Sequence, residues 1–228
     1  MILWDQTLLK LFQKGGFTMW PLLLCSILAA AVIVERAIFF QLLRLHYDRF
    51  LEELKGLLSK RRYKEAREFC GRRGHPVCRI AAVYLDHLGN DRLRADVLKR
   101  EGSYALEKVE TRLRVLGALT HIAPLLGLLG TVTGLVGAFH RIELLSGQVQ
   151  AGDLAAGIWE ALITTVFGLV IAIPSMAAYH VFEAAADKVA RHMKFIISEL
   201  DGVFGKETET GFRVTDPEKV EESMKAVQ

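Results

Sequence analysis

Two uncharged stretches of the chain carry threonines, prolines and glycines at helical spacing. In residues 115–140 the small and hydroxyl-bearing positions recur every three or four residues, at Thr120, Pro124, Gly127, Thr131, Gly134 and Ala138. In residues 161–182 the corresponding set is Ala161, Thr165, Gly168, Ala172, Ser175 and Tyr179. Residues three or four apart share one face of an α-helix. Each stretch therefore predicts a helix with one small, polar face.

Two roles fit such a face. Small residues let helices approach closely in lipid, which would make the face a packing surface and nothing more. The prolines favour an ion path, because Pro124 and Pro174 each leave a backbone carbonyl without its usual helical donor. Such carbonyls need a partner or water inside a bilayer. A ring of these helix pairs, with the threonine hydroxyls, predicts a narrow and partly hydrated path.

Depth along each helix predicts which of these residues meet. Counting 1.5 Å per residue from the helix ends places Pro124 and Pro174 at similar levels, and Thr131 and Thr165 together in the other half. In an antiparallel pair we expect proline near proline and threonine near threonine. The alternative is that the hydroxyls bond back to carbonyls of their own helices.

Neither stretch contains an Asp or a Glu. Carriers of protons or ions in a membrane usually use an intramembrane carboxylate. Glu160 lies only at the start of the later stretch, and Glu35 lies at the end of an earlier apolar segment. If the chain conducts ions, we expect a partner to supply the titrating group.

The elements that must position these residues are membrane helices. The chain has 228 residues, of which 51% are hydrophobic and 24% charged. Asp, Glu, Lys and Arg are absent from residues 15–34, 115–140 and 161–182, and about 20 apolar residues suffice to cross a bilayer. This distribution excludes an ordinary soluble enzyme, a disordered chain and a disulfide scaffold. It predicts an all-α, polytopic membrane protein with three transmembrane helices.

Charge placement predicts the topology. Residues 44–114 contain 18 Lys and Arg against 11 Asp and Glu, and basic residues near span ends mark the cytoplasmic side. We expect the amino terminus outside and the carboxyl terminus inside. The predicted segments are a periplasmic amphipathic segment (1–16), transmembrane helix 1 (17–43), a cytoplasmic helical region (44–114), transmembrane helix 2 (115–140), a periplasmic loop (141–157), transmembrane helix 3 (158–182), and a cytoplasmic helical extension and tail (183–228).

Helical signals continue outside the spans. Apolar residues recur at helical spacing through the cytoplasmic region, and the helix leading into the second span should begin near Asp91, which we expect to cap it. The basic surface is interpreted as topology signal and attraction to lipid headgroups rather than a nucleic-acid face. Cys70, His75, Cys78 and His87 match no strong metal pattern, so neither a metal nor another cofactor is predicted.

The polar stretches also resemble a known family. The run from Ala123 to Gly134 and the run from Glu160 to Pro174 resemble the signatures of the MotA/TolQ/ExbB proton channel family. Pro21 and the Glu35–Arg36 pair are similar to the family at the first span. The three-span layout resembles ExbB and TolQ more than the four-span flagellar stators. Thr133 departs from the family, because several relatives have a larger residue there.

The resemblance implies an assembly and a mechanism. It implies a homopentamer in the bacterial inner membrane around single-span helices of an ExbD-like or TolR-like partner, whose membrane aspartate carries the proton. A TonB-like or TolA-like protein would receive the force. By the resemblance, Thr131 and Thr165 match the family's pore-facing threonines, and Glu160 matches its acidic residue at the start of the third span. Together with the small and polar faces of the two stretches, this predicts an ion pathway lined by Thr131, Thr165, Thr164, Pro124, Pro174, Gly127, Gly168 and Glu160. Three alternatives stay open: a non-conducting membrane scaffold, a sodium-driven motor subunit, and a membrane enzyme or metal protein.

Overall fold

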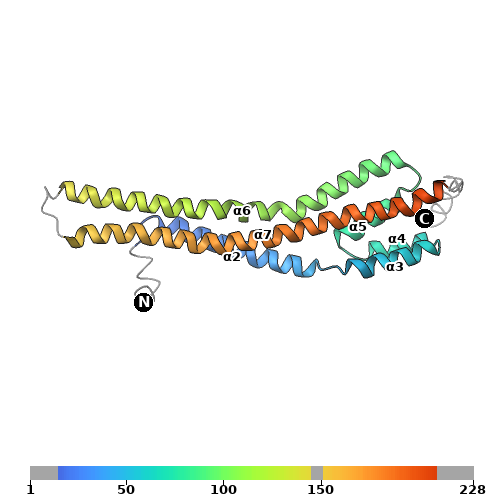
Figure 1. Ribbon diagram of the computed structural model, residues 1–228, viewed down its shortest axis with the longest axis horizontal. Coiled ribbons are helices and arrows are strands. Elements are labelled where there is room, and N and C mark those ends of the chain that lie inside the picture. Colours follow the sequence, from blue (N-terminus) through green and yellow to red (C-terminus); the bar gives the residue numbers. More distant parts are fainter. Residues whose placement is uncertain (1–14, 145–150, 210–228) are drawn as a thin grey trace. The chain divides into compact units, whose positions relative to one another are not determined.

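The structure is a computed structural model that describes residues 15–144 and 151–209. The predicted amphipathic segment lies almost wholly outside the described residues, as do the centre of the predicted loop and the end of the tail. The described part is helical and contains no strand (Figure 1). Its helices are α2 (Met19–Leu42), α3 (Tyr47–Ser59), α4 (Tyr63–Gly71), α5 (Pro76–Asp86), α6 (Asp91–Leu144) and α7 (Ala151–Glu209).

Three of these helices, α2, α6 and α7, are long and apolar enough to cross a membrane. Helix α6 has 54 residues and α7 has 59. At 1.5 Å per residue each is more than twice as long as the roughly 30 Å hydrocarbon core of a bilayer. Each therefore combines an apolar span with a polar extension. Both helices also continue beyond the predicted span ends, so residues 141–144 and 151–157 are helical.

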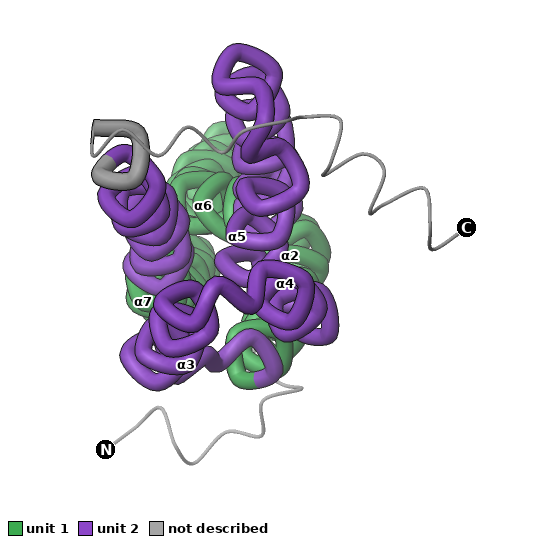
Figure 2. The backbone as a smooth tube through the Cα atoms, turned by 90° about the vertical axis from the view of Figure 1, so that its right-hand side faces the viewer, with its two compact units in different colours: residues 1–41, 111–183 green, residues 42–110, 184–228 purple. Residues whose placement is uncertain are grey.

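The chain divides into two compact units (Figure 2). The first, here called the span unit, comprises residues 1–41 and 111–183, and the second, the bundle unit, comprises residues 42–110 and 184–228. Helices α6 and α7 contribute to both units, whereas α3, α4 and α5 belong to the bundle unit alone.

In the span unit, α6 and α7 are antiparallel and closely packed. A Cβ atom built on Gly117 would lie 3.0 Å from the Tyr179 ring at one end of the contact, and one on Gly157 would lie 2.5 Å from the Ala138 Cβ at the other. Glycine and alanine at these crossings let the two backbones approach, as expected for helices that associate in lipid. The predicted small-residue face is thus, at these positions, a packing surface.

Helix α2 packs on this pair through one face. Its buried residues are Met19, Leu22, Cys25, Ala29 and Arg36, at the three- and four-residue spacing of a single helical face. The rings of Phe40 and Phe182 stack with centroids 5.6 Å apart. Large apolar side chains on the other faces of α2, α6 and α7 stay exposed, among them Trp20, Leu125 and Ile173. Such a surface suits lipid or further protein rather than water.

The bundle unit has an ordinary water-soluble type of core. Side chains of Phe50, Leu54, Ile80, Tyr84 and Ile196 are at most 1% exposed, and they belong to a buried cluster drawn from α3, α4, α5, α6 and α7. Burying large apolar and aromatic side chains is the main source of stability for such a unit. The helical spacing of Phe50, Leu54 and Leu58 in the sequence reflects this packing.

The start of α6 corrects one expectation. Asn90, not Asp91, caps the helix, because the Asn90 Oδ1 accepts a hydrogen bond of 3.1 Å from the backbone N–H of Leu93. Asp91 is already inside the first turn, where its carboxylate pairs with Arg94 at 3.0 Å. Asparagine is as good an N-cap as aspartate, and an acidic residue in the first turn complements the helix dipole.

Candidate functional site

Hydroxyl groups from α7 converge on one backbone carbonyl of α6. The Thr165 Oγ1 donates to the Gly127 carbonyl at 3.2 Å. The Thr164 Oγ1 lies 3.2 Å from the same carbonyl oxygen and 2.7 Å from the Ala161 carbonyl of its own helix. A hydroxyl carries a single proton, so the shorter contact holds Thr164 to Ala161 and leaves Thr165 as the donor across the helix pair.

Glycines create the space for this contact. A Cβ on Gly168 would lie 2.7 Å from the Ala123 carbonyl oxygen and 3.2 Å from the Gly127 Cα. A Cβ on Gly130 would overlap the Thr164 side chain. Two of the obstructing groups are backbone atoms that cannot rotate away, so a side chain at Gly168 would push the helices apart. The structure therefore brings together Gly127, Gly168 and Thr165, three of the residues predicted from the sequence.

The two threonines of α7 differ in accessibility. Thr164 is completely buried between the helices, whereas Thr165 is half-buried. Of these two threonines, Thr165 is therefore the one whose side chain is partly exposed in the span unit while its hydroxyl donates to the Gly127 carbonyl. Of the two threonines, Thr164 fills space between the helices, and Thr165 is the better candidate for meeting an ion or water.

Thr131 does not join this cluster. Its hydroxyl donates to the Leu128 carbonyl of its own helix at 2.6 Å, as the back-bonding alternative expects. Across from Thr165 the structure places Gly127, four residues before Thr131, which is about one helical turn. The expectation that threonine meets threonine is therefore replaced by a threonine that meets a glycine carbonyl. Thr131 remains half-buried on the same helix.

The prolines occupy different surroundings. Pro124 is half-buried within α6, and Pro174 is exposed on α7. Neither has an N–H, so the carbonyls of Thr120 and Val170 lack their usual donor four residues later. Side-chain hydroxyls bond backbone carbonyls near both, Thr120 to Gly117 at 2.6 Å and Ser175 to Ile171 at 2.7 Å.

Glu160 lies about one helical turn before Thr164 on α7, against the segment that precedes α2. Gly16 has a positive φ of 66°, and a Cβ there would collide with the Glu160 carboxylate. Glycine at this position is required twice over, because other residues rarely adopt this backbone conformation and because the carboxylate occupies the space. The half-buried carboxylate is thus held beside a backbone turn.

An ion-pair cluster in the span unit was not foreseen. The Arg36 Nε lies 2.7 Å from the Glu35 Oε2, and the Arg112 Nη1 lies 3.4 Å from the Glu35 Oε1. Arg36 also stacks on Phe39, with its guanidinium carbon 4.4 Å from the ring centroid. Its side chain is only 4% exposed, and a buried arginine needs such partners. The sequence signal was the Glu35–Arg36 dipeptide, but nothing in it indicated Arg112.

Two cysteines of the bundle unit are packed in its core, and one histidine caps a helix. Cys70 and Cys78 are fully buried, and burial raises the pKa of the Cys70 thiol to about 12 and that of Cys78 to about 11. The His75 Nδ1 accepts a hydrogen bond of 3.1 Å from the backbone N–H of Val77 and so caps α5. In the described residues no group of three or more His, Cys, Asp or Glu could hold a metal ion.

Comparison with known proteins decides the family. Residues 76–194, which make up about half of the chain and include both Gly127 and Thr165, match the MotA/TolQ/ExbB proton channel family. The chain belongs to the MotA/TolQ/ExbB family. With its three membrane-compatible helices it is accordingly a multi-pass membrane protein, in a family of transport-associated subunits that are not known as enzymes.

Individual relatives of this MotA/TolQ/ExbB protein agree. ExbB-like 1 of Synechocystis, named for biopolymer transport, is 31% identical over 202 residues, which cover 86% of the chain and 79% of the relative. The biopolymer transport protein exbB1 of Vibrio cholerae is 29% identical, with 85% of the chain and 86% of the relative covered. The Tol-Pal system protein TolQ of Pseudomonas aeruginosa is 32% identical over 46% of the chain and 45% of its own length.

Proposed function

We propose that the chain is an ion-conducting subunit of an inner-membrane complex of the ExbB–ExbD or TolQ–TolR type, which couples the proton motive force to work on another envelope protein. The observation that carries the proposal is the hydroxyl of Thr165, which is half-buried and bonded to the Gly127 carbonyl between the apolar spans of α6 and α7. Family membership and relatives named for biopolymer transport support it.

The conducting role requires a partner. Residues 115–140 and 161–182 contain no Asp or Glu, and hydroxyls or carbonyls at neutral pH do not release and rebind protons as a carboxylate does. The chain would thus supply polar ligands along the path, and a single-span ExbD-like or TolR-like partner would supply the titrating carboxylate. Glu160 would then attract cations at the outer mouth, and Gly168 would set the helix separation.

Orientation and assembly follow from the same proposal. The excess of Lys and Arg in residues 44–114 favours a cytoplasmic bundle unit and an external amino terminus. The broad exposed apolar faces of α2, α6 and α7 favour further protein around the path. A homopentamer would enclose the partner helices with the Thr131 and Thr165 faces inward. Pro124 and Pro174 would leave carbonyls for water along that lining.

A complementation assay with Thr165→Val tests the path. Valine keeps the shape of threonine but removes the donor to Gly127, so we expect normal assembly and loss of proton-driven output. Thr133→Val is the matched control, because the Thr133 hydroxyl bonds only carbonyls of its own helix, Leu129 at 3.0 Å and Gly130 at 3.1 Å. Wild-type output from Thr165→Val would favour the scaffold alternative, in which the polar face serves packing alone.

The coupled ion is tested separately. Output that follows an imposed sodium gradient, and persists when a protonophore collapses the pH gradient, would assign the chain to a sodium-driven relative. Output that a protonophore abolishes supports protons. Hydroxyl and carbonyl oxygens suit either ion, so the Thr165 contact does not choose between them.

A further inference from the structure

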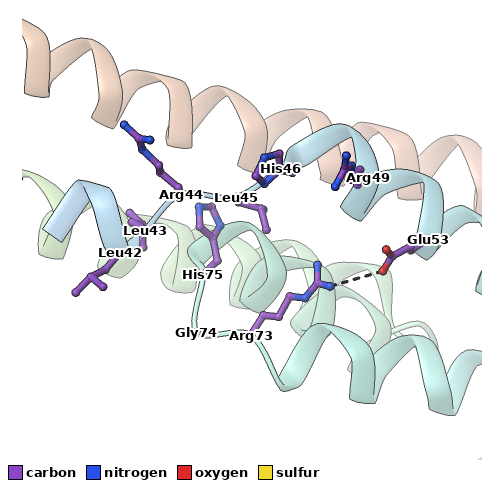
Figure 3. Close-up of a pocket in the computed structure, with 10 residues that line it drawn as sticks. All are labelled: Leu42, Leu43, Arg44, Leu45, His46, Arg49, Glu53, Arg73, Gly74 and His75. Carbon is purple, nitrogen blue, oxygen red and sulfur yellow. Dashed lines mark ion pairs between the residues drawn. The ribbon is translucent and has the colours of Figure 1, made fainter. Parts of the chain in front are cut away.

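A cavity of about 650 Å³ lies in the bundle unit at the chain's exit from α2 (Figure 3). Three segments surround it: residues 42–46 at and after the end of α2, the first turns of α3, and residues 73–75, which precede α5. Its charged lining consists of Arg44, Arg49 and Arg73 against the single acid Glu53. Three guanidinium groups around one cavity with one carboxylate indicate a ligand of negative charge.

Among the described residues, two of the arginines have no acidic partner. Arg73 pairs with Glu53 at 3.6 Å and stacks on Phe69 with its guanidinium carbon 4.5 Å from the ring centroid. Within the described part of the chain, by contrast, no ion pair engages Arg44 or Arg49. Asp48, beside Arg49 in the first turn of α3, is not among the lining residues. The net positive charge of the cavity is therefore open to an incoming anion.

The N-terminus of α3 adds to the preference of this cavity for an anion. His46, which lines the cavity, is the N-cap residue of the 13-residue helix α3, yet its side chain makes no capping hydrogen bond. The first backbone N–H groups of that helix are thus left for another acceptor, and helix N-termini favour anions. His75, which also lines the cavity, differs because its Nδ1 already caps α5. Burial lowers the pKa of His75 to about 4, so at neutral pH it adds no charge.

We propose that this cavity is a binding site for a phosphate-bearing anion, held by Arg44 and Arg49 with Arg73 as a third, internally paired guanidinium. Planar guanidinium groups bind phosphate oxygens through paired hydrogen bonds. Arg44 lies two residues after the end of α2, a candidate membrane span. The phosphate can accordingly belong to an anionic lipid headgroup or to a soluble phosphate ester. The site does not depend on whether the chain conducts ions.

Binding by the purified full-length protein tests the site. One arm titrates inorganic phosphate at constant ionic strength, set with chloride, and follows the shift in thermal unfolding. The other arm compares nanodiscs of phosphatidylglycerol and phosphatidylcholine and measures lipid retained by the protein in native mass spectrometry. Phosphate binding alone identifies a soluble source, retention of phosphatidylglycerol alone identifies a headgroup, and either result supports the site.

Matched variants separate a site from general charge. Arg44→Gln/Arg49→Gln should weaken binding about thirtyfold, since each of the two basic residues near a membrane surface contributes roughly 1 kcal/mol to attracting an anion. Arg92→Gln/Arg100→Gln removes the same charge from exposed positions of α6 outside the cavity and should leave binding unchanged. Arg44→Lys/Arg49→Lys, which keeps the charge, should bind at an intermediate level and serves if the glutamine variant does not fold.

The proposal has clear contrary results. It is overturned if the wild-type protein binds inorganic phosphate no better than chloride and retains phosphatidylglycerol no better than phosphatidylcholine. It is also overturned if the two glutamine variants lose binding equally, because the attraction would then be diffuse.

Discussion

Replacement of Gly168 by alanine should separate the two helices that carry the candidate path. Among the described glycines, Gly168 makes the closest approach to a backbone atom of another helix. A new Cβ would lie 2.7 Å from the Ala123 carbonyl oxygen, about 0.7 Å short of an ordinary contact that begins at 3.4 Å. Because the obstacle is backbone, relief requires helix displacement, and overpacking of this kind costs about 1–3 kcal/mol.

Gly137→Ala is the control that separates the cost of this collision from the effect of alanine on helix stability. Gly137 lies on α6 with nothing within 4 Å of its virtual Cβ, so its replacement brings the same gain in helix propensity without a collision. Unfolding of both variants in detergent, followed by circular dichroism over a denaturant series, gives the difference directly. We expect Gly168→Ala to be less stable than Gly137→Ala by about 1–3 kcal/mol, a factor of about 5 to 150 in the unfolding equilibrium.

The same experiment can refute the reasoning. If Gly168→Ala is as stable as Gly137→Ala, the approach of α6 and α7 at Gly168 is not tight, and the geometry that brings Thr165 to Gly127 loses its support. If it is less stable yet proton-driven output is normal, the contact matters for packing but not for conduction.

Three further outcomes concern the bundle unit. Burial, reinforced by the nearby His192, lowers the pKa of His75 from 6.5 to about 4. As the pH falls through this range the unfolded chain binds the proton before the folded chain does, so the free energy of unfolding should fall by about 3 kcal/mol. His75→Asn can still cap α5 and should remove this part of the pH dependence. Cys70 and Cys78 are buried thiols with raised pKa values, so a maleimide should label them only after denaturation. Tyr84→Phe removes the 2.6 Å hydrogen bond to Asp201 and should cost about 1 kcal/mol in thermal or chemical unfolding.

Each of these outcomes has a contrary result. An unchanged pH dependence in His75→Asn would mean that His75 titrates normally in the folded chain. Rapid maleimide labelling of native protein would contradict the burial of the two thiols. For Tyr84, the exposed Tyr104 supplies the control, and equal effects of Tyr84→Phe and Tyr104→Phe would show that the Asp201 hydrogen bond contributes nothing.

The helices of the span unit, and the face through which α6 and α7 contact each other, could be predicted from residue types alone. Uncharged stretches of sufficient length indicate spans, and the spacing of Gly127, Gly134 and Ala161 indicates the contact face. The register of α6 against α7 could not be predicted. Depth in the membrane follows only roughly from the ends of the uncharged stretches, and an error of one helical turn puts Thr131 where the structure has Gly127. Hydrogen bonding between helices depends on that register.

Contacts between segments far apart in the chain could not be predicted from the sequence either. Arg112 meets Glu35 across 77 positions of sequence. The arginines of the cavity come from the connection between α2 and α3, the first turn of α3, and the connection between α4 and α5. Helical periodicity reports which face of each helix is apolar, but not which helices meet. Asn90 illustrates a smaller limit, because two adjacent good capping residues cannot be told apart by type.

Proton flux in proteoliposomes tests the central claim most directly. The chain is reconstituted with and without an ExbD-like or TolR-like single-span protein, and a pH-sensitive dye inside the vesicles reports flux under an imposed potential. We predict proton flux only when both proteins are present. Thr165→Val should reduce this flux about tenfold, which corresponds to a barrier raised by roughly 1.4 kcal/mol, and Thr133→Val should leave it unchanged. No flux with the partner present, or equal flux with Thr165→Val, would contradict it.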